Sequence, residues 1–218
     1  MTAILDISSL AASEIHVSYD GASALSGVSA AFGPGTVTAI SGGNGSGKST
    51  LLGVLAGTIS PRSGQVRRAN SHELPALVVQ RSAADDALPL TVGDVVSMGR
   101  WADRGMWRRL SVDDRETVRS CLQAMGILHL ADRPLGSLSG GQRQRAFVAQ
   151  GLARRANVLL LDEATAGVDA EALDLIVTAL RAEAERGATV VHASHEMAVL
   201  SEADAVVRLE QGRVVTPS

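Results

Sequence analysis

One short stretch of this sequence narrows the choice of folds sharply. It reads Gly42, Gly43, Asn44, Gly45, Ser46, Gly47, Lys48, Ser49 and Thr50, and it fits the pattern G-x-x-x-x-G-K-[ST]. Glycine lacks a Cβ, so the backbone N–H groups of such a loop approach an anion closely and surround it. A helix that begins directly after the loop adds the positive end of its dipole. The pattern therefore predicts a phosphate-binding loop between a strand and a helix.

The residues around the loop agree with this prediction. Residues 36–40 are a β-branched run typical of a buried strand, and residues 51–56 are apolar enough for a buried helix. Lys48 is the only lysine among the 20 lysine and arginine residues of the chain. A compact ammonium on a flexible stem suits phosphate oxygens, so we expect Lys48 to reach the β- and γ-phosphates of a nucleotide. The hydroxyl of Ser49 is expected to take one position around Mg²⁺.

Composition limits the class of protein. A chain of 218 residues can bury the core of one domain, and its net charge of −3 gives no basic field for nucleic acid. One cysteine, Cys121, excludes an internal disulfide and fits a reducing compartment. No apolar run approaches the roughly 18 residues of a membrane span, and the first residues lack the pattern of a signal peptide. We therefore expect a soluble, cytoplasmic protein.

Short strands and turns are expected on both sides of the loop and its helix. The predicted strands cover residues 15–19, 25–32, 65–68 and 74–79, the last ending at Gln80, and the turns lie at residues 20–21, 33–35 and 60–64. The pattern of the first twelve residues is ambiguous.

The middle of the chain has a helical pattern instead, from Thr91 to about Ala153. Thr91 is expected to cap a helix that runs through Met98, and Ser111 to Asp114 fit a capping box. Strands and helices then alternate again: strand 158–161, helix 170–185, strand 188–191, helix 196–201 and strand 205–209.

This alternation predicts an α/β fold with a mainly parallel sheet covered by helices on both faces. The helical block interrupts the alternation and is best interpreted as an all-helical insertion. We expect a single domain over residues 1–218, made of a core of residues 1–90 and 151–218 and a helical subdomain of residues 91–150.

Two carboxylates, Asp162 and Glu163, follow the apolar strand predicted at residues 158–161. Ligands of parallel sheets bind beyond the carboxyl ends of the strands, which is where the glycine loop also lies. One carboxylate is expected to hold Mg²⁺ through water, and its neighbour to accept a proton from an attacking water. Alone, such a pair usually marks a solvated strand end. Together with the loop it predicts a catalytic site.

A second glycine motif precedes a long helical stretch and reads Leu138, Ser139, Gly140, Gly141 and Gln142. Ser139 and Gln142 fit a capping box, so one interpretation is a plain helix start. However, two glycines in a first turn weaken a helix by roughly 0.5–1 kcal/mol each relative to alanine. A second phosphate contact, which needs bare N–H groups, explains why glycine stands there.

Taken in order, these stretches resemble the ATP-binding subunits of ABC transporters. Residues 42–50 match the Walker A loop, residues 159–163 the Walker B strand with its catalytic glutamate, and residues 138–142 the family signature. Further matches are Gln80 to the Q-loop glutamine, His195 to the switch histidine, Asp169 to the D-loop and Tyr19 to the aromatic residue that stacks on adenine. Ala164 and Gly43 depart from the pattern, since many members have proline there. The resemblance implies a P-loop (RecA-like) core with an N-terminal antiparallel β subdomain.

The resemblance also implies roles for these residues. Ser49, Gln80 and Asp162 would surround Mg²⁺, Glu163 would be the general base or position the water, and His195 would contact the γ-phosphate of ATP. Ser139, Gly140 and Gly141 would bind the ATP held by a second copy of the chain. The active unit would then be a head-to-tail homodimer that forms on binding ATP.

The resemblance finally implies a separate energy-coupling subunit on the cytoplasmic face of the membrane. Its partners would be integral-membrane permease subunits and an extracytoplasmic substrate-binding protein, with no nucleic acid. Residues 95–100, 130–133 and 167–169 resemble the ATPases of zinc and manganese importers, although iron-chelate importers share the first two stretches. Two other classes stay open: a soluble ABC ATPase acting on DNA or ribosomes, and a P-loop kinase or GTPase. The last leaves the signature and His195 unexplained.

Overall fold

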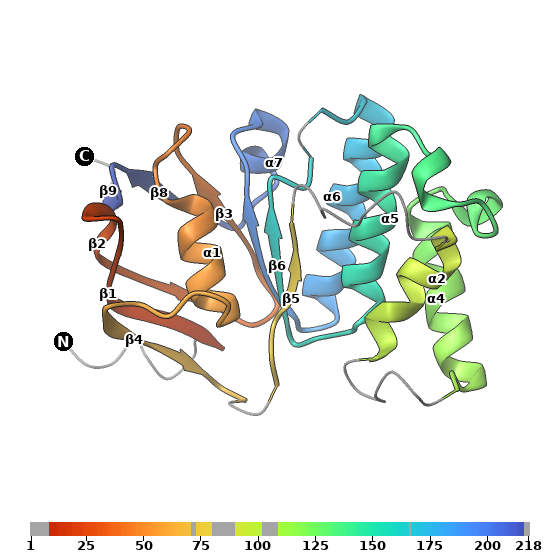
Figure 1. Cartoon of the computed structure of the whole chain (residues 1–218), viewed down its shortest axis with the longest axis horizontal. Coiled ribbons are helices and arrows are strands. Elements are labelled where there is room, and N and C mark those ends of the chain that lie inside the picture. The colour runs from red at the N-terminus through yellow and green to blue at the C-terminus, as the bar shows by residue number, and fades with distance from the viewer. Residues whose placement is uncertain (1–8, 71–72, 80–89, 102–108, 166, 216–218) are drawn as a thin grey trace. The chain divides into compact units, whose positions relative to one another are not determined.

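The computed structural model describes residues 9–70, 73–79, 90–101, 109–165 and 167–215 (Figure 1). The chain divides into two compact units that alternate along the sequence. Unit 1 comprises Met1–Leu77, Ala156–Glu163 and Leu180–Ser218, and unit 2 comprises Val78–Arg155 and Ala164–Ala179.

Unit 1 contains an antiparallel sheet of three strands in the order β2-β1-β4. The strands are β1 (Leu10–Tyr19), β2 (Ala22–Phe32) and β4 (Ser63–Arg68). Asp20 and Gly21 connect β1 to β2 with positive φ angles of 48° and 84°, as the predicted turn requires. The ambiguous N-terminal stretch is part of β1 from Leu10 onward, because Leu10 is fully buried and pairs with Phe32.

The second sheet has the order β5-β6-β7-β3-β8-β9. Its strands are β3 (Val37–Ser41), β5 (Ala76–Val78), β6 (Val158–Asp162), β7 (Thr189–Ala193), β8 (Ala205–Glu210) and β9 (Arg213–Val215). Neighbouring strands among β6, β7, β3 and β8 run parallel, which confirms the predicted parallel core. Only β9 was not predicted; it pairs with β8 in antiparallel orientation.

Helix α1 (Lys48–Ala56) lies between the two sheets of unit 1 and completes their shared core (Figure 1). Leu51 and Leu55 pack there with side chains from both sheets, among them Ile15 and Leu160. The helix begins at Lys48, three residues before the predicted start, because Gly47 ends the loop with φ 102° at the N-cap. The core therefore fixes the helix whose first residue is the lysine of the loop.

Unit 2 is built from helices. They are α2 (Val92–Ser97), the 3₁₀ turn η1 (Met98–Arg100), α4 (Val112–Ala124), the 3₁₀ turns η2 (Leu128–Leu130) and η3 (Leu135–Ser137), and α5 (Gly140–Ala153). Thr91, Ser111 and Ser139 each cap a helix through a capping box, which confirms the caps predicted at all three. In the described part of the chain, no helix combines the length and the hydrophobicity of a membrane span.

The ends of several elements differ from the predicted ones. β5 is shorter than the predicted strand 74–79, because Leu74 is 57% exposed and Pro75 has no N–H group for a strand partner. Helix α7 (Met197–Ser201) begins after Glu196, which is its N-cap. Helix α6 (Ala170–Glu185) has the predicted bounds; its last residues belong to unit 1. Gln80 lies outside the described residues.

Candidate functional site

The glycine loop of unit 1 is held by close backbone contacts. At Gly42 (φ 155°) a Cβ would lie 2.2 Å from the carbonyl oxygen of Leu209, and at Gly47 (φ 102°) it would lie 2.8 Å from that of Ala24. Neither position can accept another residue without a shift of the backbone. A Cβ at Gly43 would meet no atom within 4 Å, so the loop has space for a larger residue at this position.

Lys48 lies folded over this loop and is only 5% exposed. Its Nζ donates hydrogen bonds to the carbonyl oxygens of Gly42 (2.9 Å) and Gly43 (3.1 Å). The same Nζ lies 3.6 Å from Oε1 of Glu163. The lysine of the loop and the second carboxylate after β6 are thus neighbours, although the sequence separates them widely.

Asp162 ends β6 next to the loop. Burial raises the pKa of its carboxyl group, and a hydrogen bond with the Ser49 side chain partly offsets this. Its Oδ1 is buried and has no hydrogen-bond partner among the described residues. A hydroxyl beside an unsatisfied carboxylate oxygen is a suitable pair of oxygen ligands for Mg²⁺. The donor atoms present therefore fit the ion that the sequence predicts.

Glu163 turns the chain away from the sheet. Its φ angle is 48°, in a region that residues other than glycine seldom adopt, and its N–H donates to the carbonyl oxygen of Ala193 (3.0 Å). Such strain often accompanies functional sites. Ala164, which replaces the usual proline, is fully buried. The structure thus brings Lys48, Ser49, Asp162 and Glu163 together in unit 1.

The other predicted residues of unit 1 lie at the ends of neighbouring strands. Tyr19 ends β1 and is 49% exposed, so its ring is accessible. His195 follows β7 and is exposed, and the preceding Ser194 donates its N–H to the carbonyl oxygen of Ile40 (3.1 Å) at the end of β3. His195 therefore follows a segment that is fixed beside the start of the glycine loop.

The signature motif lies at the start of α5 in unit 2. The Ser139 Oγ accepts from the N–H of Gln142 (3.3 Å), and the Ser139 N–H donates to the Gln142 side chain (3.1 Å). Leu138 precedes this cap, and a Cβ at Gly140 or Gly141 would meet no atom within 4 Å. The capping interpretation is confirmed. The capping box does not fill the space beside the two glycines.

Asp169, the predicted D-loop residue, also lies in unit 2. Its Oδ1 accepts from the N–H of Ala172 (2.8 Å), so it caps the first turn of α6.

Sequence reasoning missed the turn after β8 that contacts the glycine loop. The Gly212 N–H, between β8 and β9, donates to the carbonyl oxygen of Ser46 (3.1 Å). The Ser46 Oγ is buried and has no partner among the described residues. No local signal marks this turn, because its contact with the loop connects two distant parts of the chain.

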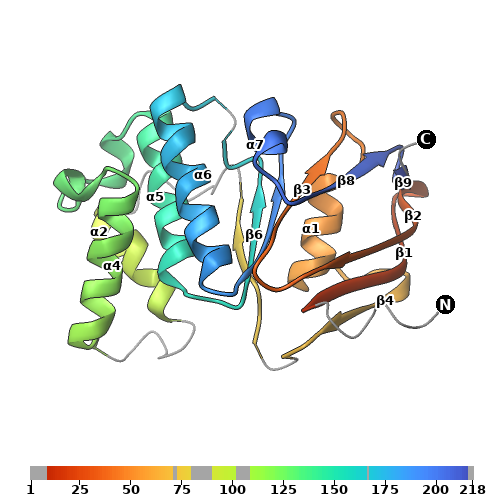
Figure 2. The same ribbon diagram turned by 180° about the vertical axis from the view of Figure 1, so that it is seen from behind.

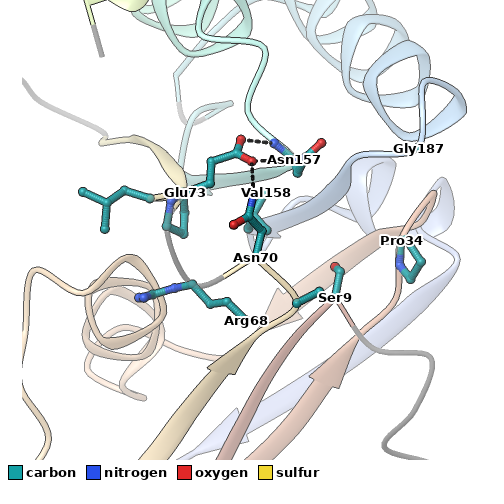
Figure 3. A pocket seen from close by; sticks show the side chains of 11 residues that line it. Ser9, Pro34, Arg68, Asn70, Glu73, Asn157, Val158 and Gly187 are labelled. Atoms are coloured by element: carbon teal, nitrogen blue, oxygen red, sulfur yellow. Dashed lines mark hydrogen bonds between the residues drawn. The ribbon is translucent and has the colours of Figure 1, made fainter. Parts of the chain in front are cut away.

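A pocket of about 310 Å³ in unit 1 contains none of the predicted site residues (Figure 3). On its wall, the Glu73 carboxylate accepts hydrogen bonds from the backbone N–H (2.8 Å) and the side chain (2.5 Å) of Asn157. Asn70 donates to the same carboxylate at 3.4 Å. These hydrogen bonds use both carboxylate oxygens of Glu73 and fix the start of β6. Asp162 lies at the other end of that strand.

Comparison with known proteins agrees with this site. A family model described as ABC transporter matches residues 25–166. A metal transport system ATP-binding protein of Chlamydia pneumoniae is 39% identical over 186 residues, which cover 83% of this chain and 72% of that protein. A manganese transport system ATP-binding protein of Synechocystis is 36% identical over 209 residues, covering 92% of this chain and 80% of that protein.

Solved structures agree as well. The structure of cbiO1 from Clostridium perfringens, part of the ABC transporter complex cbiONQ, is 32% identical with a TM-score of 0.79, and the match covers 97% of this chain and 88% of that one. The predicted fold class is thereby confirmed. The chain belongs to the ABC transporter family, as one of its ATP-binding, ATP-hydrolysing subunits.

Proposed function

We propose that this chain is the energy-coupling ATPase subunit of an importer for manganese or zinc ions. When ATP binds, two copies form a head-to-tail dimer. The dimer acts on a separate membrane permease at the cytoplasmic face of the membrane. The observation that carries the proposal is the grouping of Lys48, Ser49, Asp162 and Glu163 at one place in unit 1.

Lys48 is the residue that recognises the phosphates. Its Nζ already donates to two backbone carbonyl oxygens and lies 3.6 Å from a carboxylate oxygen, so phosphate oxygens would replace neighbours of the same kind. Ser49, Asp162 and Gln80 would hold Mg²⁺, which neutralises charge on the phosphate oxygens when it is bound. Burial raises the pKa of Asp162 even with Lys48 nearby, and a bound cation would lower it, so Mg²⁺ would favour the charged form of this carboxylate.

Glu163 is the residue that accepts the proton of the attacking water. It is 19% exposed, so water can reach it, and its backbone is fixed by the bond to Ala193. His195, on the segment tied to the end of β3, contacts the γ-phosphate and orients it for the attack. Tyr19 offers an exposed ring on which adenine stacks.

The signature residues act on a nucleotide bound by the other copy. Ser139, Gly140 and Gly141 begin α5, so their N–H groups and the positive end of the helix are available to an anion. The open space at both glycines supports this role, since a Cβ there would disturb nothing within the chain itself. Asp169 would lie close to the same shared boundary.

The cargo is inferred from relatives and from short sequence stretches. The relative from Synechocystis is named for manganese transport, and residues 95–100, 130–133 and 167–169 resemble zinc and manganese importers. An extracytoplasmic binding protein in the same system would deliver the ion. The second candidate is an iron-chelate importer, because such importers share the first two of those stretches.

Uptake by cells tests the proposal. A strain that lacks this chain should lose most of its uptake of radioactive manganese or zinc, and the wild-type chain should restore it. Lys48→Ala should fail to restore uptake, whereas Arg119→Gln, an exposed change on α4, should restore it fully. Loss of iron-chelate uptake alone would select the second candidate. Normal uptake of all three would contradict the proposed cargo and leave another small substrate or a soluble ATPase without a transport role.

A further inference from the structure

Two arginines connect opposite ends of the helix pair α4 and α5 in unit 2. The two helices pack side by side in both views of the structure (Figures 1 and 2). Arg100 joins the start of α4 to the end of α5, and Arg145 joins the first half of α5 to the end of α4. The helices are therefore antiparallel and linked near each end. We call Arg100 and Arg145 the arginine clamp.

Arg100 makes the larger set of contacts. Its Nε donates to Oδ1 of Asp114 (3.0 Å), and its Nη1 donates to the carbonyl oxygens of Ala153 (3.0 Å) and Arg154 (3.1 Å). The last carbonyl groups of a helix have no partner within the helix, and a cation there also interacts favourably with the helix dipole. One guanidinium thus caps the end of α5 and ties it to α4.

This contact is largely shielded from water. The side chain of Arg100 is 14% exposed and that of Asp114 is 2% exposed. The second carboxylate oxygen of Asp114 accepts from the N–H (2.9 Å) and the hydroxyl (2.7 Å) of Ser111, the cap of α4. Removal of Arg100 would therefore take a hydrogen-bonded cation away from a buried carboxylate, which is costly.

Gly99 explains how Arg100 reaches this position. A Cβ at Gly99 would lie 2.3 Å from the carbonyl oxygen of Gln150, so η1 presses directly against α5. Only glycine permits this approach, and the next residue then extends across the end of the helix. The last two residues of the stretch 95–100, which resembles metal importers, therefore help to hold α4 and α5 together.

Arg145 holds the opposite end of the pair, close to the signature. Its Nη1 donates to the carbonyl oxygen of Met125 (3.1 Å), the C-cap of α4. Gly126 follows with φ 64°, which ends α4 and leaves room for the guanidinium beside it. The two arginines together define both the axis and the lengthwise position of α5.

We propose that Arg100 is a positioning residue for ATP hydrolysis, which acts through α5 on Ser139, Gly140 and Gly141 at the other end of that helix. The inference rests on the proposed function, in which these residues bind the ATP of the second copy. A helix of 14 residues transmits a tilt at its last turn to its first, because its backbone bonds make it stiff. Misplacement by about 1 Å can cost about a hundredfold in rate.

The test compares Arg100→Gln with Arg100→Lys and with the exposed control Arg119→Gln, all in the full chain. Three quantities are measured: ADP affinity by titration calorimetry, kcat and KM for ATP, and ATP-induced pairing by light scattering in a Glu163→Gln background. All assays are run at one temperature, well below the lowest melting temperature among the variants, so that all the chains compared are folded.

Arg100→Gln should leave ADP affinity within about twofold, because the glycine loop, Lys48 and Ser49 belong to unit 1, but lower kcat and pairing by about ten- to a hundredfold. The kcat and pairing of Arg100→Lys should lie between those of Arg100→Gln and the wild type, because an ammonium group replaces some of the hydrogen bonds of the guanidinium. A purely structural role would lower only the melting temperature and leave kcat and pairing equal to those of Arg119→Gln, and that result would overturn the proposal. If Ser139→Arg also pairs and hydrolyses normally, the proposed function fails and not the clamp alone.

Discussion

The phosphate loop of unit 1 and the signature of unit 2 use glycine in opposite ways. At Gly42 and Gly47 a Cβ would collide with backbone atoms of the same unit, whereas at Gly140 and Gly141 it would meet nothing within 4 Å. Likewise Lys48 is 5% exposed with its donors engaged, whereas Ser139 and Gly140 are exposed. The loop is shaped by its own unit. The signature is shaped locally by a helix cap, and its glycines stay open to a ligand.

The largest expected effect separates binding from catalysis within unit 1. Glu163→Gln keeps the size of the side chain but removes its capacity as a base, so kcat should fall by about 10²–10⁴-fold while ATP still binds. Turnover and bound nucleotide are measured on the same purified sample. Glu171→Gln, at an exposed position in α6, is the control and should turn over normally. Wild-type turnover by Glu163→Gln would remove Glu163 from the mechanism.

The next effect compares two glycines of the same loop. Gly47→Ala adds a Cβ at φ 102° and within 2.8 Å of a carbonyl oxygen, whereas Gly45→Ala adds one at φ 77° in open space. The first should lower the free energy of unfolding by about 3 kcal/mol or more, and the second by about 1–2 kcal/mol from the backbone conformation alone. Urea unfolding measures both. Equal losses would show that close contacts do not shape the loop.

A pH titration tests whether the core around the parallel sheet of unit 1 excludes water from a buried histidine. His192, on β7 between Leu161 and Ala39, is fully buried, and burial lowers its pKa from 6.5 to about 4. The unfolded chain therefore binds this proton more readily than the folded one. Stability should be full above pH 6.5 and fall by about 3 kcal/mol as the pH drops to about 4.

The variant His192→Leu isolates this contribution. Between about pH 6.5 and 4, its free energy of unfolding should lack the decrease that His192 causes in the wild type. His129→Gln, at an exposed position, is the control and should keep the wild-type slope. An unchanged slope in His192→Leu would mean that folding does not lower the pKa of His192.

The smallest effect on stability is expected in the signature, where function and stability should move in opposite directions. Gly140→Ala places a better helix former in the first turn of α5 and meets no atom, so it should stabilise the chain by at most about 0.5–1 kcal/mol. The same methyl group would stand between the N–H groups and the partner's nucleotide, so ATP-induced pairing should weaken. Thermal unfolding and light scattering check the two predictions separately.

Local sequence patterns predicted those elements that are formed by residues close together in the chain. The glycine loop, the caps at Ser111 and Ser139, the carboxylates after β6 and the bounds of α6 all depend on a few consecutive residues, and the structure has them. These elements were predictable because caps, strand ends and helical periodicity are set within one or two turns.

Contacts between distant residues were not predictable. Glu73 and Asn157 lie 84 positions apart, and Arg100 and Ala153 lie 53 apart, yet each pair is within hydrogen-bond distance. Glutamate, asparagine and arginine are ordinary surface residues in sequence, so nothing marks these partners before the chain is folded. The nearness of Lys48 and Glu163 is the exception, because the sequence predicted that the carboxylates after the strand lie beside the glycine loop. It follows from the parallel strands β3 and β6, which deliver both side chains to one edge of the sheet.

The account depends most on a site shared by two copies, and one mixing experiment tests it. Ser139→Arg places a bulky cation where the partner's nucleotide should lie, but it leaves the loop of the same chain unchanged. Each such chain should bind ATP singly and fail to pair or hydrolyse it. Lys48→Ala chains should likewise fail alone, because their loop is impaired.

Mixing the two variants should restore one complete site per pair, from the loop of the Ser139→Arg chain and the signature of the Lys48→Ala chain. The measurement is ATP-induced association of the two separately tagged, separately purified variants. We expect association in the mixture and none in either variant alone. If Ser139→Arg chains pair and hydrolyse ATP like the wild type, the signature is only the cap of α5, and the shared site does not exist.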